Sequence, residues 1–139
     1  MTAKYKIAKL AEIPSPVPPD PDSFEWKPIR HHLGVRAFGV NAGVAPRVGD
    51  WVVEEHTELQ GGAAGHEELY FVATGHARFS IDGEEVDAPA GTLVFVPDPT
   101  THRSAKAHEP GTTVLYIGAR RGVAFEISPW EQKYFKDND

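Results

Sequence analysis

Residues 91–102 read GTLVFVPDPTTH, and they supply the clearest evidence for a β fold. A glycine that can turn the chain precedes a short apolar run, and two prolines that cannot continue a central strand follow it. A run that is apolar on both faces of a strand is typical of a strand covered on both sides. We therefore expect a buried strand at residues 92–96, with His102 just beyond the proline-rich turn.

The same alternation of short apolar runs and turns continues toward the N-terminus. Residues 69–74 (LYFVAT) and 77–81 (ARFSI) predict strands, and Gly75 separates them. Asp82-Gly83 is a strong signal for a two-residue hairpin turn. Residues 84–87 are therefore expected to return antiparallel to residues 77–81.

The pattern of short apolar runs and turns along the whole chain predicts an all-β fold. Further strands are expected at residues 5–10, 35–40, 51–59, 102–107, 112–117 and 123–127. The 13 glycines and 12 prolines fall largely between these runs, which is typical of a β-sandwich or barrel. One barrel domain is predicted over residues 24–139, preceded by an N-terminal strand and proline-rich arm over residues 1–23.

The two ends of the chain depart from the strand pattern. Five prolines within residues 14–21 predict a stiff, extended connector. Ser128-Pro129-Trp130-Glu131 has the pattern of a capped helix start, so a short helix is expected at residues 129–136. Its aromatic residues would cover an open end of the barrel or a partner subunit; they are Trp130, Tyr134 and Phe135.

Composition excludes several function classes. The 139 residues contain no cysteine, which rules out disulfides, thiolate nucleophiles and cysteine-based metal sites, so any metal would have nitrogen and oxygen ligands. A net charge of −6 argues against nucleic-acid binding. We see no apolar stretch long enough for a membrane helix and no apolar segment of a secretory signal. We therefore expect a cytoplasmic protein without nucleic-acid or membrane partners.

Two spaced motifs resemble those of the cupin family. Glu68 is followed by six residues and Gly75, and Gly91 is followed by five residues, Pro97 and then His102. The words EELYFVATG and GTLVFVPDPTTH carry the resemblance, which covers about residues 35–118. It implies a small antiparallel jelly-roll barrel, often a homodimer, with a site inside the barrel.

The resemblance also implies a set of metal ligands. In metal-binding cupins, two histidines and a glutamate of the first motif and a histidine of the second hold one divalent metal. Glu68 and His102 occupy two of these four positions. The other two carry small residues, which are Gly62 and Ala64 or, at the longer spacing, Gly61 and Ala63. The second motif has Pro99 in place of its glycine and Lys106 in place of its asparagine.

Neighbouring residues offer replacement ligands. His66, Glu68 and Tyr70 share one face of a strand because side chains alternate. Together with His102 they would supply two imidazoles and a carboxylate, a set suited to iron, manganese, nickel or zinc with open positions for substrate. We take His66, Glu68 and His102 as candidate ligands and His56, which shares a strand face with Glu54 and Glu58, as a fourth.

The same residues have structural interpretations. His66 follows a glycine-rich loop and would then be an exposed rim residue. His56 would be a half-buried strand residue bonded to a neighbouring carboxylate. Sequence reasoning leaves both interpretations open.

Three functions therefore remain in view. The first is binding of a small molecule inside the barrel, and the expected pocket residues are His56, His66, Glu68, Tyr70 and His102. The second is a metal-dependent enzyme of the oxygenase or isomerase class. The third is a structural or regulatory dimer. The sequence assigns no catalytic residue and no ligand identity.

Overall fold

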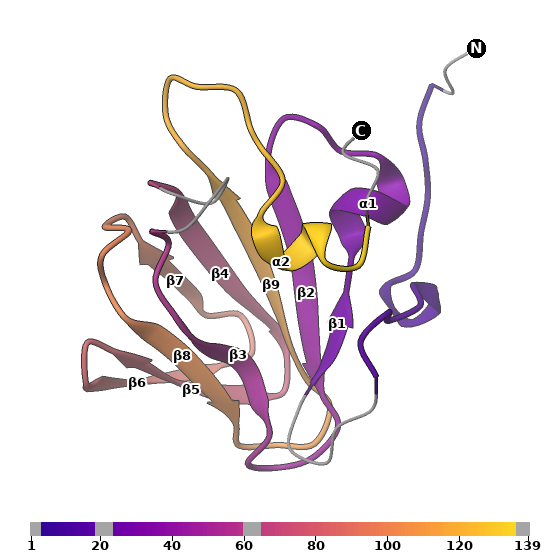
Figure 1. Cartoon of the computed structure of the whole chain (residues 1–139). Coiled ribbons are helices and arrows are strands. Elements are labelled where there is room, and N and C mark those ends of the chain that lie inside the picture. Colours follow the sequence, from indigo (N-terminus) through magenta and orange to yellow (C-terminus); the bar gives the residue numbers. More distant parts are fainter. Residues whose placement is uncertain (1–3, 19–23, 60–64, 136–139) are drawn as a thin grey trace.

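The computed structural model describes residues 4–18, 24–59 and 65–135. Within these ranges the chain forms two antiparallel sheets that face each other (Figure 1). The five-stranded sheet has the order β1 (Glu25–Lys27), β2 (Gly39–Ala45), β9 (Thr112–Ala119), β4 (Glu67–Thr74) and β7 (Leu93–Val96). The four-stranded sheet has the order β3 (Trp51–His56), β8 (Arg103–Ala107), β5 (His76–Ile81) and β6 (Glu84–Pro89).

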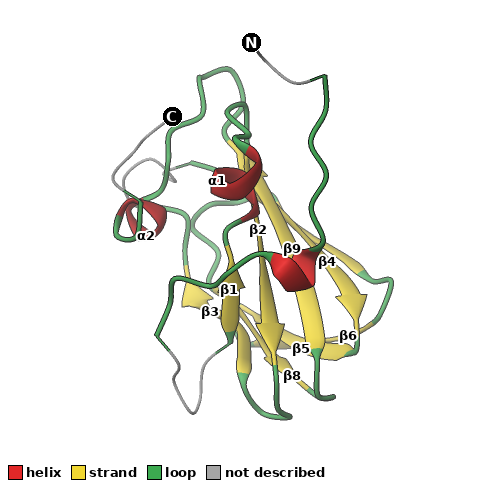
Figure 2. Ribbon diagram, turned by 90° about the vertical axis from the view of Figure 1, so that its right-hand side faces the viewer, coloured by secondary structure: helices red, strands yellow, loops and turns green. Residues whose placement is uncertain are grey.

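Short helices lie outside the sheets (Figure 2). They are the 3-10 turn η1 (Leu10–Glu12), α1 (Ile29–Leu33) and α2 (Pro129–Gln132). The all-β antiparallel prediction is confirmed, with the strands arranged as two sheets rather than one continuous barrel. The hairpin between β5 and β6 is also confirmed, since Asp82 and Gly83 both have positive φ angles, 47° and 83°.

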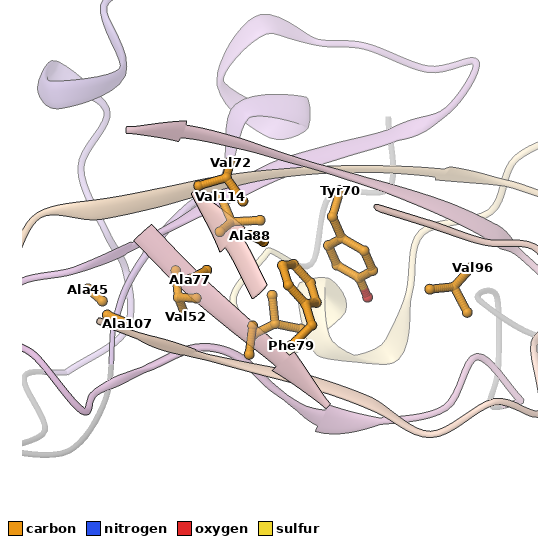
Figure 3. Close-up of a cluster of buried hydrophobic side chains, with 12 residues drawn as sticks. Ala45, Val52, Tyr70, Val72, Ala77, Phe79, Ala88, Val96, Ala107 and Val114 are labelled. Carbon is orange, nitrogen blue, oxygen red and sulfur yellow. The ribbon is translucent and has the colours of Figure 1, made fainter. Parts of the chain in front are cut away.

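The core lies between the sheets and is closed at one end by small side chains (Figure 3). Alanines from four strands meet there with valines and a phenylalanine: Ala45, Val52, Val72, Ala77, Phe79, Ala88, Ala107 and Val114. Close approach of the two sheets also requires a glycine in β2. A Cβ at Gly43 would lie 2.6 Å from the carbonyl oxygen of Val52 and would also meet the Tyr116 hydroxyl.

Two predicted strands are absent. Residues 5–9 form no strand and lead into η1, and residues 123–127 are irregular. The N-terminal segment is attached by contacts of its own: Ile13 is buried, and its carbonyl oxygen accepts a hydrogen bond from Lys27 Nζ at 2.8 Å. Alternation along a short run was therefore not sufficient evidence for pairing.

Other predicted strands are shifted. The strand expected at residues 35–40 starts only at Gly39 as β2, and β1 and α1 were not expected. β3 ends at His56 rather than at residue 59. Its register against β8 shifts twice, so Val52 and Val53 are both buried although they are adjacent.

The strand expected to be buried on both faces is not. β7 is the edge strand of the five-stranded sheet, and Leu93 and Phe95 are 62% and 55% exposed. Val94 and Val96 on its other face pack into the core. The prediction for residues 92–96 was therefore right for one face and wrong for the other.

The C-terminal segment covers one end of the fold. α2 is shorter than expected, but its start is capped as predicted, with the Glu131 amide donating to Ser128 Oγ at 3.3 Å. The rings of Trp130, Tyr134 and Phe135 lie 5.7, 5.8 and 6.2 Å from that of Trp26. Of the two expected roles, covering an end of the fold or a partner subunit, these contacts with Trp26 agree with the first. Residue 136 and prolines 19 and 21 lie outside the described ranges, and the predicted division after residue 23 stays a prediction.

Candidate functional site

The other end of the space between the sheets is hollow. A cavity of about 310 Å³ lies where β2, β3, β4 and β9 approach the C-terminal segment. Antiparallel pairing places the end of β9 beside the starts of β2 and β4. The end of β3, in the facing sheet, approaches the same place through His56, whose Nε2 lies 3.4 Å from Glu68 Oε1. Aromatic residues supply much of the lining: Phe24, Trp26, Tyr70, Tyr116, Phe125 and Trp130.

Ionisable side chains gather on one side of the cavity. Glu68 of β4 is the centre of the group: its Oε1 accepts hydrogen bonds from the Tyr70 hydroxyl and from Arg103 Nη1, the latter at 3.1 Å. His56 Nε2 lies 3.4 Å from the same Glu68 oxygen and 3.8 Å from Glu58 Oε2. One carboxylate oxygen is thus shared by a phenol, a guanidinium and an imidazole.

The two carboxylates of this group have opposite pKa shifts. Burial, together with the negative charge of Glu68, raises the pKa of Glu58 to about 8. Burial also opposes ionisation of Glu68, but the hydrogen bonds and charge supplied by His56 and Tyr70 outweigh it and lower the pKa of Glu68. At neutral pH Glu58 therefore carries a proton and can donate a hydrogen bond, whereas Glu68 is ionised and accepts.

The pKa of His56 follows from the same contacts. Burial alone would lower it, but the hydrogen bond and charge of Glu68 raise the pKa on balance. Burial and the charge of Glu68 raise the pKa of Tyr70 well above its ordinary value. Tyr70 therefore stays protonated and can donate to Glu68.

Arg103 is a site residue that sequence reasoning missed. Its side chain is fully buried: Nε donates to Thr101 O at 2.9 Å, Nη2 to Asp98 O at 3.0 Å, and Nη1 to Glu68. A signal was present in residues 103–107, RSAKA, because alternation places Arg103 on the same face as two buried alanines. An arginine on an otherwise small, buried face requires a partner inside the fold.

The structure brings together three of the five expected pocket residues directly. His56, Glu68 and Tyr70 form the hydrogen-bonded group. His66 is buried and lines the cavity, with its ring 5.6 Å from that of Phe125. The interpretation of His66 as an exposed rim residue is therefore wrong.

His102 is not brought to the cavity. Its side chain is 65% exposed, and Nδ1 lies 2.6 Å from Oε1 of Glu55, whose side chain is also mostly exposed. Because β8 starts at Arg103 with that side chain pointing inward, the preceding histidine points outward. The motif spacing located the correct turn, but the side chain that enters the fold belongs to Arg103, the residue after His102.

The donor atoms that converge differ from the expected ligand set of His66, Glu68 and His102. In the described part of the chain, the group that could hold a metal ion is His56, Glu58 and Glu68, whose donor atoms all lie within 4.8 Å of one another. An imidazole and two carboxylates suit iron, manganese, nickel or zinc. The sequence had placed Glu58 only on the same strand face as His56, outside the expected ligand set. A metal bound here would have to share the Glu68 carboxylate with the positively charged guanidinium of Arg103.

Several solved structures share this fold. A cupin protein from Bacteroides fragilis aligns over 87% of this chain and 88% of its own, with 21% identity and a TM-score of 0.62. An RmlC-like cupin protein from Desulfovibrio desulfuricans covers 82% and 95%, with 21% identity and a TM-score of 0.61. A predicted oxalate decarboxylase from Thermotoga maritima covers 83% and 99%, with 17% identity and a TM-score of 0.60. The fold is therefore that of a cupin, as the two motifs predicted.

A family model makes the assignment more specific. Residues 60–134, more than half of the chain, match the AraC-like ligand binding domain, and the chain belongs to this family. No curated protein matches the sequence. In the described ranges, no helix has the length and apolar character needed to cross a membrane.

Proposed function

We propose that the protein binds a small molecule in the cavity between its two sheets. The observation that carries this proposal is the contrast between the aromatic lining and the hydrogen-bonded group of Glu68, Tyr70 and His56 at one side of it. Ligand pockets in proteins are mostly apolar with a few placed polar groups, and about 300 Å³ is at the small end of their range. Membership of a ligand-binding domain family agrees with this function.

The lining also favours certain ligands over others. Among the described residues no lysine or arginine lines the cavity, whereas several glutamates do: Glu54, Glu55, Glu58, Glu68 and Glu131. A carboxylate accepts hydrogen bonds and disfavours a nearby anion. We therefore expect a compact neutral or cationic ligand that carries hydroxyl or amino groups and has an apolar face for the aromatic rings.

NMR titration of the full chain, labelled with ¹⁵N, tests the proposal. Three panels of similar size would be compared: monosaccharides, small primary amines and small carboxylic acids. Binding inside the cavity should shift the amide signals of Gly39 and Gly118, which line it, and leave those of Gly83 and Gly111 in distant turns unchanged. Shifts produced only by the acids, or none at Gly39 and Gly118 with any panel, would contradict the proposal.

A matched pair of histidine variants sharpens this test. His56→Gln removes a side chain that contacts Glu68 in the cavity, whereas His102→Gln changes an exposed side chain outside it. Losing a hydrogen bond to a charged group costs about 1.5–3 kcal/mol, so the first change should weaken binding about tenfold or more. The second should leave the affinity unchanged.

The convergence of His56, Glu58 and Glu68 favours a second candidate function, binding of one divalent metal. Metal analysis of protein purified without a histidine tag, stripped with EDTA and reloaded with iron, manganese, nickel or zinc tests it. We expect near-stoichiometric metal in the unaltered protein, a marked loss in Glu58→Gln, and no change in the exposed control Glu67→Gln. Absence of bound metal would exclude this candidate and leave the small-molecule proposal standing.

A further inference from the structure

Two carboxylates in the cavity wall are each backed by a buried arginine. Glu68 accepts a hydrogen bond from Arg103 Nη1 at 3.1 Å, and Glu131 accepts one from Arg30 Nε at 2.6 Å. Both glutamates line the cavity, whereas the arginine side chains are 0% and 1% exposed and are not part of the lining. In each pair the negative group therefore faces the cavity, and the compensating positive group lies behind it.

Glu131 has one carboxylate oxygen without a partner. Arg30 Nε binds Oε1 of Glu131, and Arg30 Nη1 donates instead to the Val35 carbonyl at 2.9 Å. Arg30 Nη2 is buried and has no hydrogen-bond partner among the described residues, so the guanidinium does not bind the carboxylate with two nitrogens. No hydrogen bond from a described residue reaches Glu131 Oε2 either, although the side chain is only 2% exposed. A carboxylate oxygen left without a donor in such a place is costly, and a ligand in the cavity can supply the donor.

The surrounding contacts fix the position of Glu131. It lies in α2, where its amide donates to Ser128 Oγ, and the neighbouring Trp130 ring lies 5.7 Å from that of Trp26. Arg30 lies in α1, and Figure 1 shows the two helices at the same end of the sheets. The ion pair and the aromatic contact thus hold the wall formed by the C-terminal segment against the two sheets.

We propose that Glu131 is a second ligand-binding carboxylate of the cavity, so that the ligand has two hydrogen-bond donor groups joined by an apolar part. This inference rests on the proposed function. One donor group binds Glu68 and the other binds Oε2 of Glu131, while the rings of Trp26 and Trp130 contact the apolar part between them. Hydrogen bonds from hydroxyl or ammonium groups to a carboxylate are charge-assisted and therefore strong.

The position of the arginines disfavours acceptor groups at the same two points. A carboxylate or phosphate of a ligand would bind the guanidinium, but Arg30 and Arg103 are covered by the fold. What the two pairs present to the cavity is carboxylate oxygen, which only accepts hydrogen bonds. Because each pair has no net charge, uncharged hydroxyl groups suffice as donors, and ammonium groups also fit.

Matched amines test the inference by NMR titration of the full chain, labelled with ¹⁵N and freed of metal with EDTA. 1,4-Diaminobutane and 1,6-diaminohexane carry two donor groups, whereas n-butylamine and n-hexylamine have the same carbon chains and one donor group. We expect the better-fitting diamine to bind about tenfold more tightly than the monoamine of the same length. It should shift both the Gly118 amide, beside Glu68, and the Trp130 indole signal, and leave the indole of Trp51, outside the cavity, unchanged.

Variants show whether Glu131 causes this preference. Glu131→Gln should lower the diamine affinity to about that of the monoamine, while the monoamine affinity changes less than about threefold. Glu126→Gln removes the same charge from an exposed residue of the same segment, so this matched control should keep the preference. Because Glu131→Gln leaves Arg30 uncompensated, the double variant Arg30→Met with Glu131→Leu replaces the whole ion pair by apolar side chains and should also lose the preference. Circular dichroism spectra identical to that of the unaltered protein confirm folding.

The outcomes distinguish this inference from the proposed function. A diamine preference that survives in Glu131→Gln and in the double variant, with Gly118 still shifted, would overturn the inference and leave ligand binding in the cavity intact. If the amines do not bind, the same variants are titrated with the tightest-binding monosaccharide. A loss of affinity of about tenfold in Glu131→Gln then supports the inference, and an unchanged affinity overturns it. Binding of acids alone, or of no compound, would contradict the proposed function and the inference with it.

Discussion

The two ends of the space between the sheets are built from opposite kinds of side chain. At one end, small residues such as Ala45, Ala77 and Ala107 bring the sheets together around Phe79. At the other end, the sheets hold a cavity and a group of charged side chains that satisfy one another around Glu68. The same two sheets thus place stabilising packing and chemical capability at separate ends.

A small β fold can tolerate buried charge when the charged groups satisfy one another. Removing carboxylates and a guanidinium from water is costly unless each finds partners. Here Arg103 has an acceptor for each of its three nitrogens, and Glu68 has three neighbours that donate or carry positive charge. The apolar end supplies net stability, and the polar end is held by mutual compensation.

The largest expected effect is at the packed end. Phe79→Ala removes a fully buried ring from the centre of the core and should lower the free energy of unfolding by about 3–5 kcal/mol. Phe38→Ala is the matched control, since that ring is 40% exposed. Urea denaturation followed by circular dichroism measures both. Equal losses for the two variants would show that the packed end is not the main source of stability.

A slightly smaller loss is expected from the polar end. Arg103→Met leaves Glu68 without the guanidinium and should cost about 3 kcal/mol, because an uncompensated buried carboxylate remains. The double variant Arg103→Met with Glu68→Leu removes both charges and should recover part of that loss. The same urea experiment measures it. A double variant that is less stable than the single one by the full additive amount would contradict mutual compensation.

The pH dependence of stability separates the two ends further. The folded-state pKa of Glu58 is raised to about 8, so its contribution is fully present below the unfolded-state pKa near 4.5 and is lost as pH rises through 8. In metal-free protein, this one group should lower the free energy of unfolding by about 1 kcal/mol between pH 7 and pH 9. Glu58→Gln should flatten that decline, and the exposed Glu67→Gln should not. His56, whose pKa is also raised, leaves a residual decline of the same sign.

The smallest expected effect concerns the histidine that the motif singled out. His102→Ala breaks only an exposed contact with Glu55 and should change the free energy of unfolding by less than about 0.5 kcal/mol. It should also leave metal content and ligand affinity unchanged. A loss of metal or ligand in this variant would show that His102 enters the site in solution.

The turns that are marked by specific residues were predicted correctly from the sequence. Asp82-Gly83, Gly75 and the Pro97–Pro99 turn each stand between strands that exist. Segments whose conformation depends on tertiary contacts were predicted less well. Residues 123–127 have an apolar composition suited to a strand, yet they form an irregular segment whose Phe125 lines the cavity.

The sequence predicted only the part of the candidate site that lies on one regular strand. Glu68 and Tyr70 were placed on one face because they lie on one strand, β4, which keeps a regular register around them, and His66 directly precedes that strand. The contribution of β8 depended on which of two adjacent residues points inward, and spacing alone selected the wrong one of His102 and Arg103. Glu58 lies beyond the end of β3, where strand alternation no longer applies.

The buried guanidinium of Arg103 also links the inside of the fold to an outside turn. Two of its nitrogens hold the carbonyls of Asp98 and Thr101, and the neighbouring Pro99 carbonyl accepts from the Glu58 amide at 2.9 Å. The turn between β7 and β8 is therefore hydrogen-bonded to the Glu58 backbone directly and to the Glu68 side chain through Arg103. A molecule that displaces Glu68 from Arg103 would loosen this turn, so a spectroscopic label on exposed Thr100 would report cavity occupancy from the surface.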